Sequence, residues 1–150
     1  MTIREIEHVK YVTEFIGVPY KWNSFDIDEG LDCRTLVVCY LQGLGYDIDG
    51  DDGIAIPRED ELVKIIGDRD SIKGLADRYI QGVREKGAEV SPEDIMRNDI
   101  VMYKTKELPH IGVYVGNGKM IVAAQRHKSL LVKLCSVKDA IITVVRVRRR

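Results

Sequence analysis

Apolar residues follow a helical period in the first part of the chain. In residues 2–16 four apolar side chains fall on one stripe, which predicts an amphipathic helix whose apolar side packs on the rest of the protein. Thr2 and Glu5 fit a capping box at its start, and Gly17 fits its end. The residues of this stripe are Ile6, Val9, Val12 and Ile16.

A second helix is predicted directly after Asp32, which suits the N-cap position, and it should end near Gly45. Its expected buried face consists of Leu36, Val37, Tyr40, Leu41 and Leu44. Residues 58–66 and 71–86 predict two further short helices, although glycines at 74 and 82 weaken the second pattern.

The pattern changes to β-rich runs after a single predicted helical turn at Ser91 and Pro92. The runs cover residues 99–104, 110–116, 119–124, 129–134 and 140–148, and "GNGK" at 116–119 is typical of a hairpin turn. Helices followed by an antiparallel meander predict an α+β fold, with N-terminal helices packed on a C-terminal antiparallel sheet. A length of 150 residues predicts a single domain, 1–150.

Composition narrows the function classes. The chain is 45% hydrophobic and 31% charged with a formal net charge of −1, which gives no reason to expect nucleic acid or a membrane as a partner. The N-terminus has acidic residues where a signal peptide needs an apolar segment, so we expect cytoplasmic synthesis without a signal peptide. Three scattered cysteines and three scattered histidines suggest neither a disulfide framework nor a metal site, and no cofactor is expected.

Cys33 occupies an unusual place for a cysteine, the first position of the second helix. The unpaired N–H groups and the dipole of a first turn favour a thiolate, so we expect a lowered thiol pKa. The same N–H groups can receive the oxyanion that forms when a thiolate attacks a carbonyl. Cys39 and Cys135, by contrast, are interpreted as small core residues in a helix and a strand.

A nucleophilic cysteine needs a base, and the pattern favours His110. His110 opens a β-run and should therefore lie at the rim of the sheet. His8 is expected on the exposed side of the first helix and His127 in a polar turn. A catalytic pair requires that Cys33 and His110 be neighbours in the folded chain and that neither be sealed in the interior.

Two blocks of the sequence resemble the NlpC-type cell-wall endopeptidases. "GVPYKWNS" and "GLDCRTLVVCYLQGLG" are similar to the family pattern G-x-P-Y-x-W-G-G, then D-C-S-G-L-V and a helix ending in glycine. "MRNDIVMYK" and "HIGVYVGNGKMIVAA" are similar to its second block, G-D-L-V-F-F and H-V-G-I-Y-L-G-N-G-x-F-I-H-A. The order and the spacing of the blocks agree over residues 15–124.

The resemblance implies a papain-like fold and a peptidoglycan hydrolase that cuts stem peptides, typically between γ-D-glutamate and a diamino acid. By position, Cys33 would be the nucleophile and His110 the general base. Tyr20 would add a hydroxyl to the oxyanion site, although it could equally be a packing residue. Without wall-binding repeats, the chain is closest in style to standalone phage or prophage tail-associated members, with phage tail proteins as partners and a place in the virion.

The chain departs from the family pattern at two places. Arg34 replaces a small residue beside the nucleophile, which would bring positive charge and bulk to the substrate groove. Val122 stands where the family has the histidine that orients the base. If Gly118 is a left-handed bulge residue, Val122 lies on the His110 face; if the turn is a simple two-residue turn, Gln125 does and could substitute. The family spacing favours the bulge.

Two alternatives to the endopeptidase stay open. One is a structural phage-tail component that keeps the fold and has lost activity, and Arg34 and Val122 favour it. The other is an amidase or acyltransferase that uses the same Cys–His pair on another acyl substrate.

Overall fold

The structure, a computed structural model, describes residues 1–49, 69–106, 108–124 and 127–150, with the side chains of 69–72 excepted. In the described residues the α-helices are α1 (Ile3–Glu14), α2 (Cys33–Gly43) and α4 (Arg69–Arg84). Single 3₁₀ turns are η1 (Pro92–Asp94), η2 (Leu134–Ser136) and η3 (Lys138–Ala140). The strands are β1 (Phe25–Asp26), β2 (Gly30–Leu31), β3 (Gly87–Val90), β4 (Ile100–Tyr103), β5 (His110–Gly116), β6 (Lys119–Val122), β7 (Leu130–Lys133) and β8 (Ile141–Val147).

The larger sheet in the described part of the chain is antiparallel and has the strand order β3-β8-β4-β5-β6-β7. The predicted α+β class is confirmed, and so are the five β-rich runs. The meander is confirmed only for β4 to β7, because β8 returns across the sheet and pairs with β4. Strands β1, β2 and β3 were not predicted, because they are short or carry no strong alternation.

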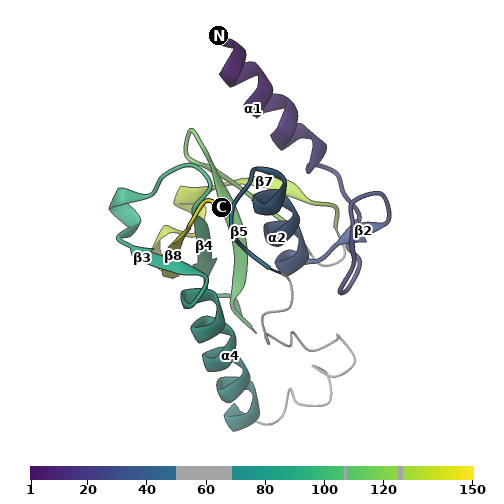
Figure 1. Cartoon of the computed structure of the whole chain (residues 1–150). Helices are drawn as coiled ribbons and strands as arrows, with labels where there is room; N and C mark the ends of the chain where they lie inside the picture. The colour runs from purple at the N-terminus through teal and green to yellow at the C-terminus, as the bar shows by residue number, and fades with distance from the viewer. Residues whose placement is uncertain (50–68, 107, 125–126) are drawn as a thin grey trace.

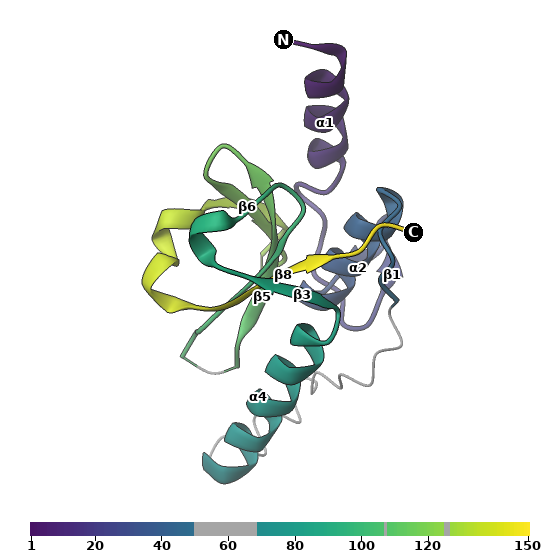
Figure 2. The ribbon, with the colours of Figure 1, turned by 60° about the vertical axis from the view of Figure 1, so that its left-hand side comes forward.

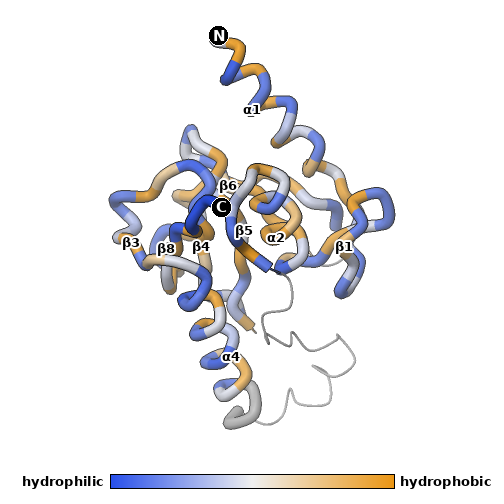
Figure 3. The backbone as a smooth tube through the Cα atoms, in the orientation of Figure 1, coloured by the Kyte–Doolittle hydropathy of each residue, from blue (hydrophilic) through white to orange (hydrophobic). Residues whose placement is uncertain are grey.

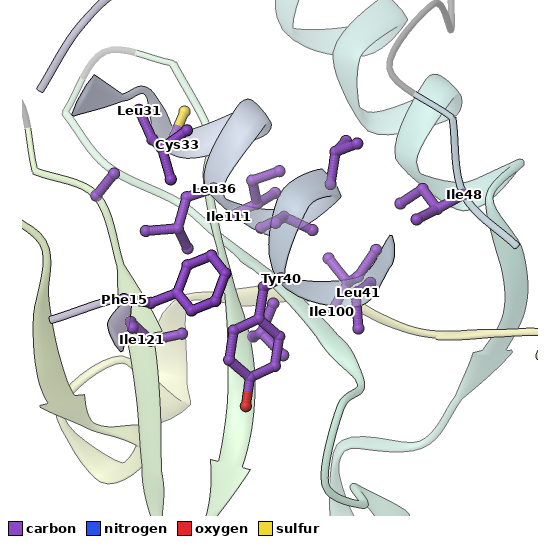
Figure 4. Close-up of a cluster of buried hydrophobic side chains, with 14 of the residues drawn as sticks. Phe15, Leu31, Cys33, Leu36, Tyr40, Leu41, Ile48, Ile100, Ile111 and Ile121 are labelled. Atoms are coloured by element: carbon purple, nitrogen blue, oxygen red, sulfur yellow. The ribbon is translucent and has the colours of Figure 1, made fainter. Parts of the chain in front are cut away.

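Helix α2 lies in front of the sheet, over β5 (Figure 1). Its apolar side meets the face of the sheet that Ile100, Ile111 and Ile121 line, and Leu36, Tyr40 and Leu41 are completely buried there (Figure 4). The burial of large apolar side chains is the main favourable term in folding, so this interface fixes the position of α2.

The other face of the sheet carries a smaller buried cluster. Val101, Met120 and Val122 form its centre, and the half-buried Tyr103 packs against it. Figure 2 shows how the sheet curls around this side. Alternation along β4 and β5 places Tyr103 and His110 on the same face as this cluster.

Helix α1 has the predicted cap but not the predicted burial. Thr2 and Glu5 form the capping box. Of the stripe, only Val12 is buried, whereas Ile6 is 41% and Val9 50% exposed. The reason is tertiary, because α1 and α4 project from opposite ends of the molecule (Figures 1 and 2). Hydrophobic and hydrophilic residues alternate along the projecting α1 (Figure 3).

The β5–β6 hairpin is bulged, but the bulge is not at Gly118 as predicted. The register shifts between Tyr114 and Gly116, whereas Asn117 and Gly118, with φ values of 53° and 72°, form a two-residue turn between the paired Gly116 and Lys119. Val113 pairs with Ile121, so Val122 lies opposite Gly112 and on the His110 face, which is the face that the bulged alternative predicts. Only glycine fits at position 112, because a Cβ atom there would lie 2.7 Å from the Val122 side chain.

Candidate active site

The first turn of α2 is held by a network of buried polar groups around Asp32. The Asp32 carboxylate accepts the N–H of Thr35 at 2.8 Å, and the Thr35 hydroxyl accepts the N–H of Asp32 at 2.9 Å. The other carboxylate oxygen accepts the N–H of Asn23 at 2.7 Å. The predicted N-cap is therefore confirmed, and it fixes the place of Cys33 at the helix start.

Cys33 is buried at this helix start, with only 7% of its surface exposed. Figure 4 shows its sulfur at the first turn of α2, beside the apolar cluster. The phenol oxygen of Tyr79, from α4, lies 3.9 Å from the Cys33 sulfur, and Tyr79 is itself only 5% exposed. Tyr79 of α4 thus covers the thiol, so the requirement that Cys33 not be sealed in the interior is not met in this conformation.

Burial raises the pKa of the Cys33 thiol to about 12, and the negative charge of Asp32 adds to the rise. Hydrogen bonds from Tyr79 and from the backbone N–H groups of Arg34 and Cys33 act in the opposite direction. The predicted lowering of the thiol pKa is therefore wrong for this conformation. The first turn does supply hydrogen-bond donors that lower the thiol pKa, but the loss of solvent raises that pKa by more.

His110 is half-buried as the first residue of β5, at the rim of the sheet as predicted. Its burial lowers the pKa of the imidazole below the ordinary value of 6.5, because a cationic ring is poorly solvated there. The ring is therefore neutral near pH 7, which is the form that a general base needs.

Tyr103 contacts His110 directly, whereas among the described contacts none joins the Cys33 sulfur to the His110 ring, so their pairing stays a prediction. Tyr103 and His110 are cross-strand partners, and the phenol oxygen lies 3.3 Å from Nδ1 of the imidazole. Burial raises the pKa of Tyr103 to about 12, and the charge of a Cys33 thiolate contributes to that rise. Tyr103 is thus bonded to the predicted base and within electrostatic reach of the predicted nucleophile.

Sequence reasoning missed both Tyr79 and Tyr103. Tyr79 lies in the segment between the two family-like blocks. No position of the family pattern corresponds to it, so the resemblance assigned it no role. Tyr103 lies inside the second block, at a position where the family pattern has phenylalanine. The sequence did contain one indication of a role for Tyr103: it carries a hydroxyl at a position where the family pattern has phenylalanine.

Arg34 is more buried than a groove residue is expected to be. It is 8% exposed, donates to the side-chain oxygen of Asn23 at 2.6 Å, and places its guanidinium 5.5 Å from the centre of the Phe25 ring. Arg34 therefore fastens the loop that precedes α2. Its predicted contact with substrate stays a prediction.

The remaining predicted residues have mixed outcomes. Tyr20 is half-buried and packs against the main core, so its oxyanion role stays a prediction. Gln125 lies outside the described residues. Cys135 is exposed in η2 rather than buried in a strand, because the chain leaves β7 just before it. His8 is not free on the surface, since its Nε2 lies 2.7 Å from the carbonyl oxygen of Val115.

The described residues offer no metal site and no membrane span. Nowhere among them do three His, Cys, Asp or Glu side chains gather closely enough to hold an ion. Within the same residues, no helix combines the length and apolar character needed to cross a bilayer.

The fold and this region together define the class: an α+β domain with a cysteine at the tip of a helix that packs on an antiparallel sheet, and a histidine at the start of one of its strands. The sequence pattern of the NlpC/P60 family matches residues 17–147, and the chain belongs to that family.

Solved structures support the same fold. The NlpC/P60 domain of the peptidoglycan hydrolase SagA superposes with a TM-score of 0.58 at 21% identity, over 93% of this chain and 95% of that one. An NlpC/P60 family protein from Bacillus cereus ATCC 10987 superposes with a TM-score of 0.61 at 17% identity, over 94% of this chain and 39% of that one.

A curated relative is the gamma-DL-glutamyl hydrolase of Bacillus subtilis strain 168, which is 28% identical over 129 residues. The match covers 83% of this chain but only 24% of the relative. Neither this relative nor the solved structures bear on the expected phage-tail association, the cytoplasmic synthesis or the single-domain prediction, which all stay predictions.

Proposed function

We propose that the chain is a cysteine endopeptidase that hydrolyses the bond between γ-D-glutamate and a diamino acid in peptidoglycan stem peptides. The observation that carries the proposal is a cysteine at the first turn of α2, together with a Tyr103–His110 pair whose phenol is within electrostatic reach of that cysteine. Membership of the NlpC/P60 family supports it, as does the similarity to a gamma-DL-glutamyl hydrolase.

In the proposed reaction the Cys33 sulfur attacks the carbonyl carbon while His110 takes the thiol proton. The C–S bond forms, the C–N bond breaks, and His110 returns the proton to the leaving amine. Water then attacks the thioester, which releases the carboxylate and restores the thiol. The backbone N–H of Cys33 is an oxyanion donor in this scheme, with the Tyr20 hydroxyl as the second.

The proposal also requires that Tyr79 move. A carbonyl carbon can approach the Cys33 sulfur only where the phenol and α4 now exclude it. Displacement of Tyr79 would also return solvent to the thiol and so reduce the main cause of its raised pKa.

The test is hydrolysis of a stem tripeptide, L-alanyl-γ-D-glutamyl-diamino acid, by the purified chain, with the free diamino acid as the measured product. The wild type should release it, and Cys33→Ala should reduce the rate by roughly 10³-fold or more. The matched control is Cys135→Ala, which removes an exposed thiol in η2 and should retain the full rate. A tripeptide with an α-linked glutamate should be a poorer substrate.

A second candidate function, a catalytically silent structural domain, is favoured by the closed thiol and by Val122. It predicts no release of diamino acid and a Cys33 thiol no more reactive than Cys135. An amidase or acyltransferase would instead release product from another acyl substrate and would lose that activity in Cys33→Ala.

A further inference from the structure

Val122 cannot orient His110. It occupies the position at which the family-like block should carry a hydrogen-bonding side chain, and it lies on the His110 face of the hairpin. Its side chain is 4% exposed and packs with Val101 and Met120. An apolar group at this place excludes water but leaves the rotation of the imidazole unconstrained from this side.

The neighbouring strand supplies a polar group on the same face. Tyr103 pairs directly with His110 across β4 and β5, and its phenol oxygen lies 3.3 Å from Nδ1. The two rings lie 5.8 Å apart between centres at an angle of 56°, so they are not stacked and the contact is made by the hydroxyl.

The phenol is itself held in place. Tyr103 packs against the cluster of Val101, Met120 and Val122, which limits its rotation. Its backbone pairs with both β5 and β8, so the strand beneath it is fixed on both sides. A hydroxyl on a rigid ring in a paired central strand is a suitable anchor for a second ring.

We propose that Tyr103 is the positioning residue for His110, in place of the side chain that Val122 cannot provide; this inference rests on the proposed function. The Tyr103 oxygen accepts the proton of Nδ1, which fixes the tautomer and leaves the lone pair of Nε2 as the base. Tyr103 acts through His110 and does not touch the reacting atoms.

The phenol differs from an imidazole in its response to pH. Since burial raises the pKa of Tyr103 to about 12, the hydroxyl stays neutral over the working range of a hydrolase. A neutral acceptor orients the ring but stabilises the imidazolium less than a charged partner does. The chain should therefore be a slower enzyme than one with a charged partner, with an orientation of His110 that does not depend on pH.

The experiment compares Tyr103→Phe with Tyr40→Phe. Tyr40 is a suitable control because it is completely buried and its hydroxyl has no hydrogen-bond partner among the described residues, so its loss tests the removal of a buried hydroxyl alone. Two quantities are measured: kcat and KM on the stem tripeptide, and the ¹⁵N chemical shifts of the His110 ring. His110→Gln assigns those signals, since the chain has only three histidines.

Tyr103→Phe should lower kcat about 10-fold or more with KM changed less than about twofold, as when an outer hydrogen-bond partner of a histidine is removed. The His110 ring should shift from the Nδ1–H tautomer toward Nε2–H. Tyr40→Phe should change neither quantity.

An unchanged His110 tautomer in Tyr103→Phe overturns the inference, whatever the rate. The nuclear magnetic resonance measurement also separates the two proposals. If the wild type releases no diamino acid, the proposed function fails, while the tautomer shift still decides whether Tyr103 positions His110.

Discussion

Helix α2 is buried both along the apolar face that packs on the sheet and at its first turn, but burial has different effects at these two places. Along the apolar face, Leu36, Tyr40 and Leu41 pack on the sheet (Figure 4). At the first turn, Asp32 and Cys33 are also buried, and Asp32 is surrounded by polar partners. Burial stabilises the apolar face, whereas at the polar first turn it must be offset by hydrogen bonds.

The difference explains why the helix start does not activate the thiol. Asp32 has three hydrogen bonds that compensate its burial. The donors around Cys33 compensate only part of the loss of solvent, and its pKa rises to about 12. A helix N-terminus favours a thiolate, but burial away from solvent opposes it and here has the larger effect. In this closed form, Cys33 is held as a neutral thiol.

The largest effect is expected on the apolar face of α2. Leu36→Ala removes a side chain with 0% exposure and should lower the free energy of unfolding by about 2–5 kcal/mol, measured by denaturant titration. The exposed Ile6, on α1, is the control, and Ile6→Ala should change stability by less than about 0.5 kcal/mol. Equal losses in the two variants would contradict the assignment of the core.

The free energy of unfolding should be less sensitive to a single truncation at the polar first turn of α2. Asp32→Ala removes the N-cap and its bonds to Thr35 and Asn23, and should cost about 1–2 kcal/mol in the same titration. Asp32→Asn keeps an acceptor and should cost less. Both changes also remove a negative charge that raises the thiol pKa, so Cys33 should titrate at a lower pH in each.

A pair of variants at Tyr79 tests what covers the thiol. Tyr79→Ala opens the site to solvent and should speed alkylation of Cys33 by iodoacetamide about tenfold, because desolvation is the largest cause of the raised thiol pKa. Tyr79→Phe keeps the cover but loses the hydrogen bond to the sulfur, so alkylation should become slower than in the wild type.

The exposed Cys135 serves as the internal standard for these alkylation rates, since it lies in η2 and should react equally in all forms. If both Tyr79 variants react faster than the wild type, the hydrogen bond does not favour the thiolate. If neither changes the rate, Tyr79 does not limit access to Cys33.

The smallest effect concerns pH and His110. Because burial lowers the His110 pKa, the unfolded chain binds the proton more readily, and the free energy of unfolding should fall as the pH drops below about 6.5. His110→Gln should show a weaker decline between pH 7.5 and 5 in denaturant titrations. If the free energy of unfolding fell equally with pH in the wild type and in His110→Gln, the His110 ring would not be desolvated in the folded protein.

The sequence by itself predicted the features that local pattern encodes. The capping box of α1, the N-cap Asp32 of α2, the position of Cys33 at a helix start and that of His110 at a strand start all follow from residues a few positions apart. The family spacing favoured the register that places Val122 on the His110 face, whereas only the structure showed that the bulge lies between Tyr114 and Gly116. Two matched blocks then sufficed to predict the fold class.

The tertiary structure decided what depends on residues far apart in the chain. The exposure of α1, the return of β8 to β4, the cover that Tyr79 places on Cys33 and the bond from Tyr103 to His110 are contacts that no local pattern reports. The pKa of the Cys33 thiol was likewise decided by the tertiary structure. The helix start that favours a thiolate is visible in the sequence, but the burial that outweighs it comes from the packing of separate elements.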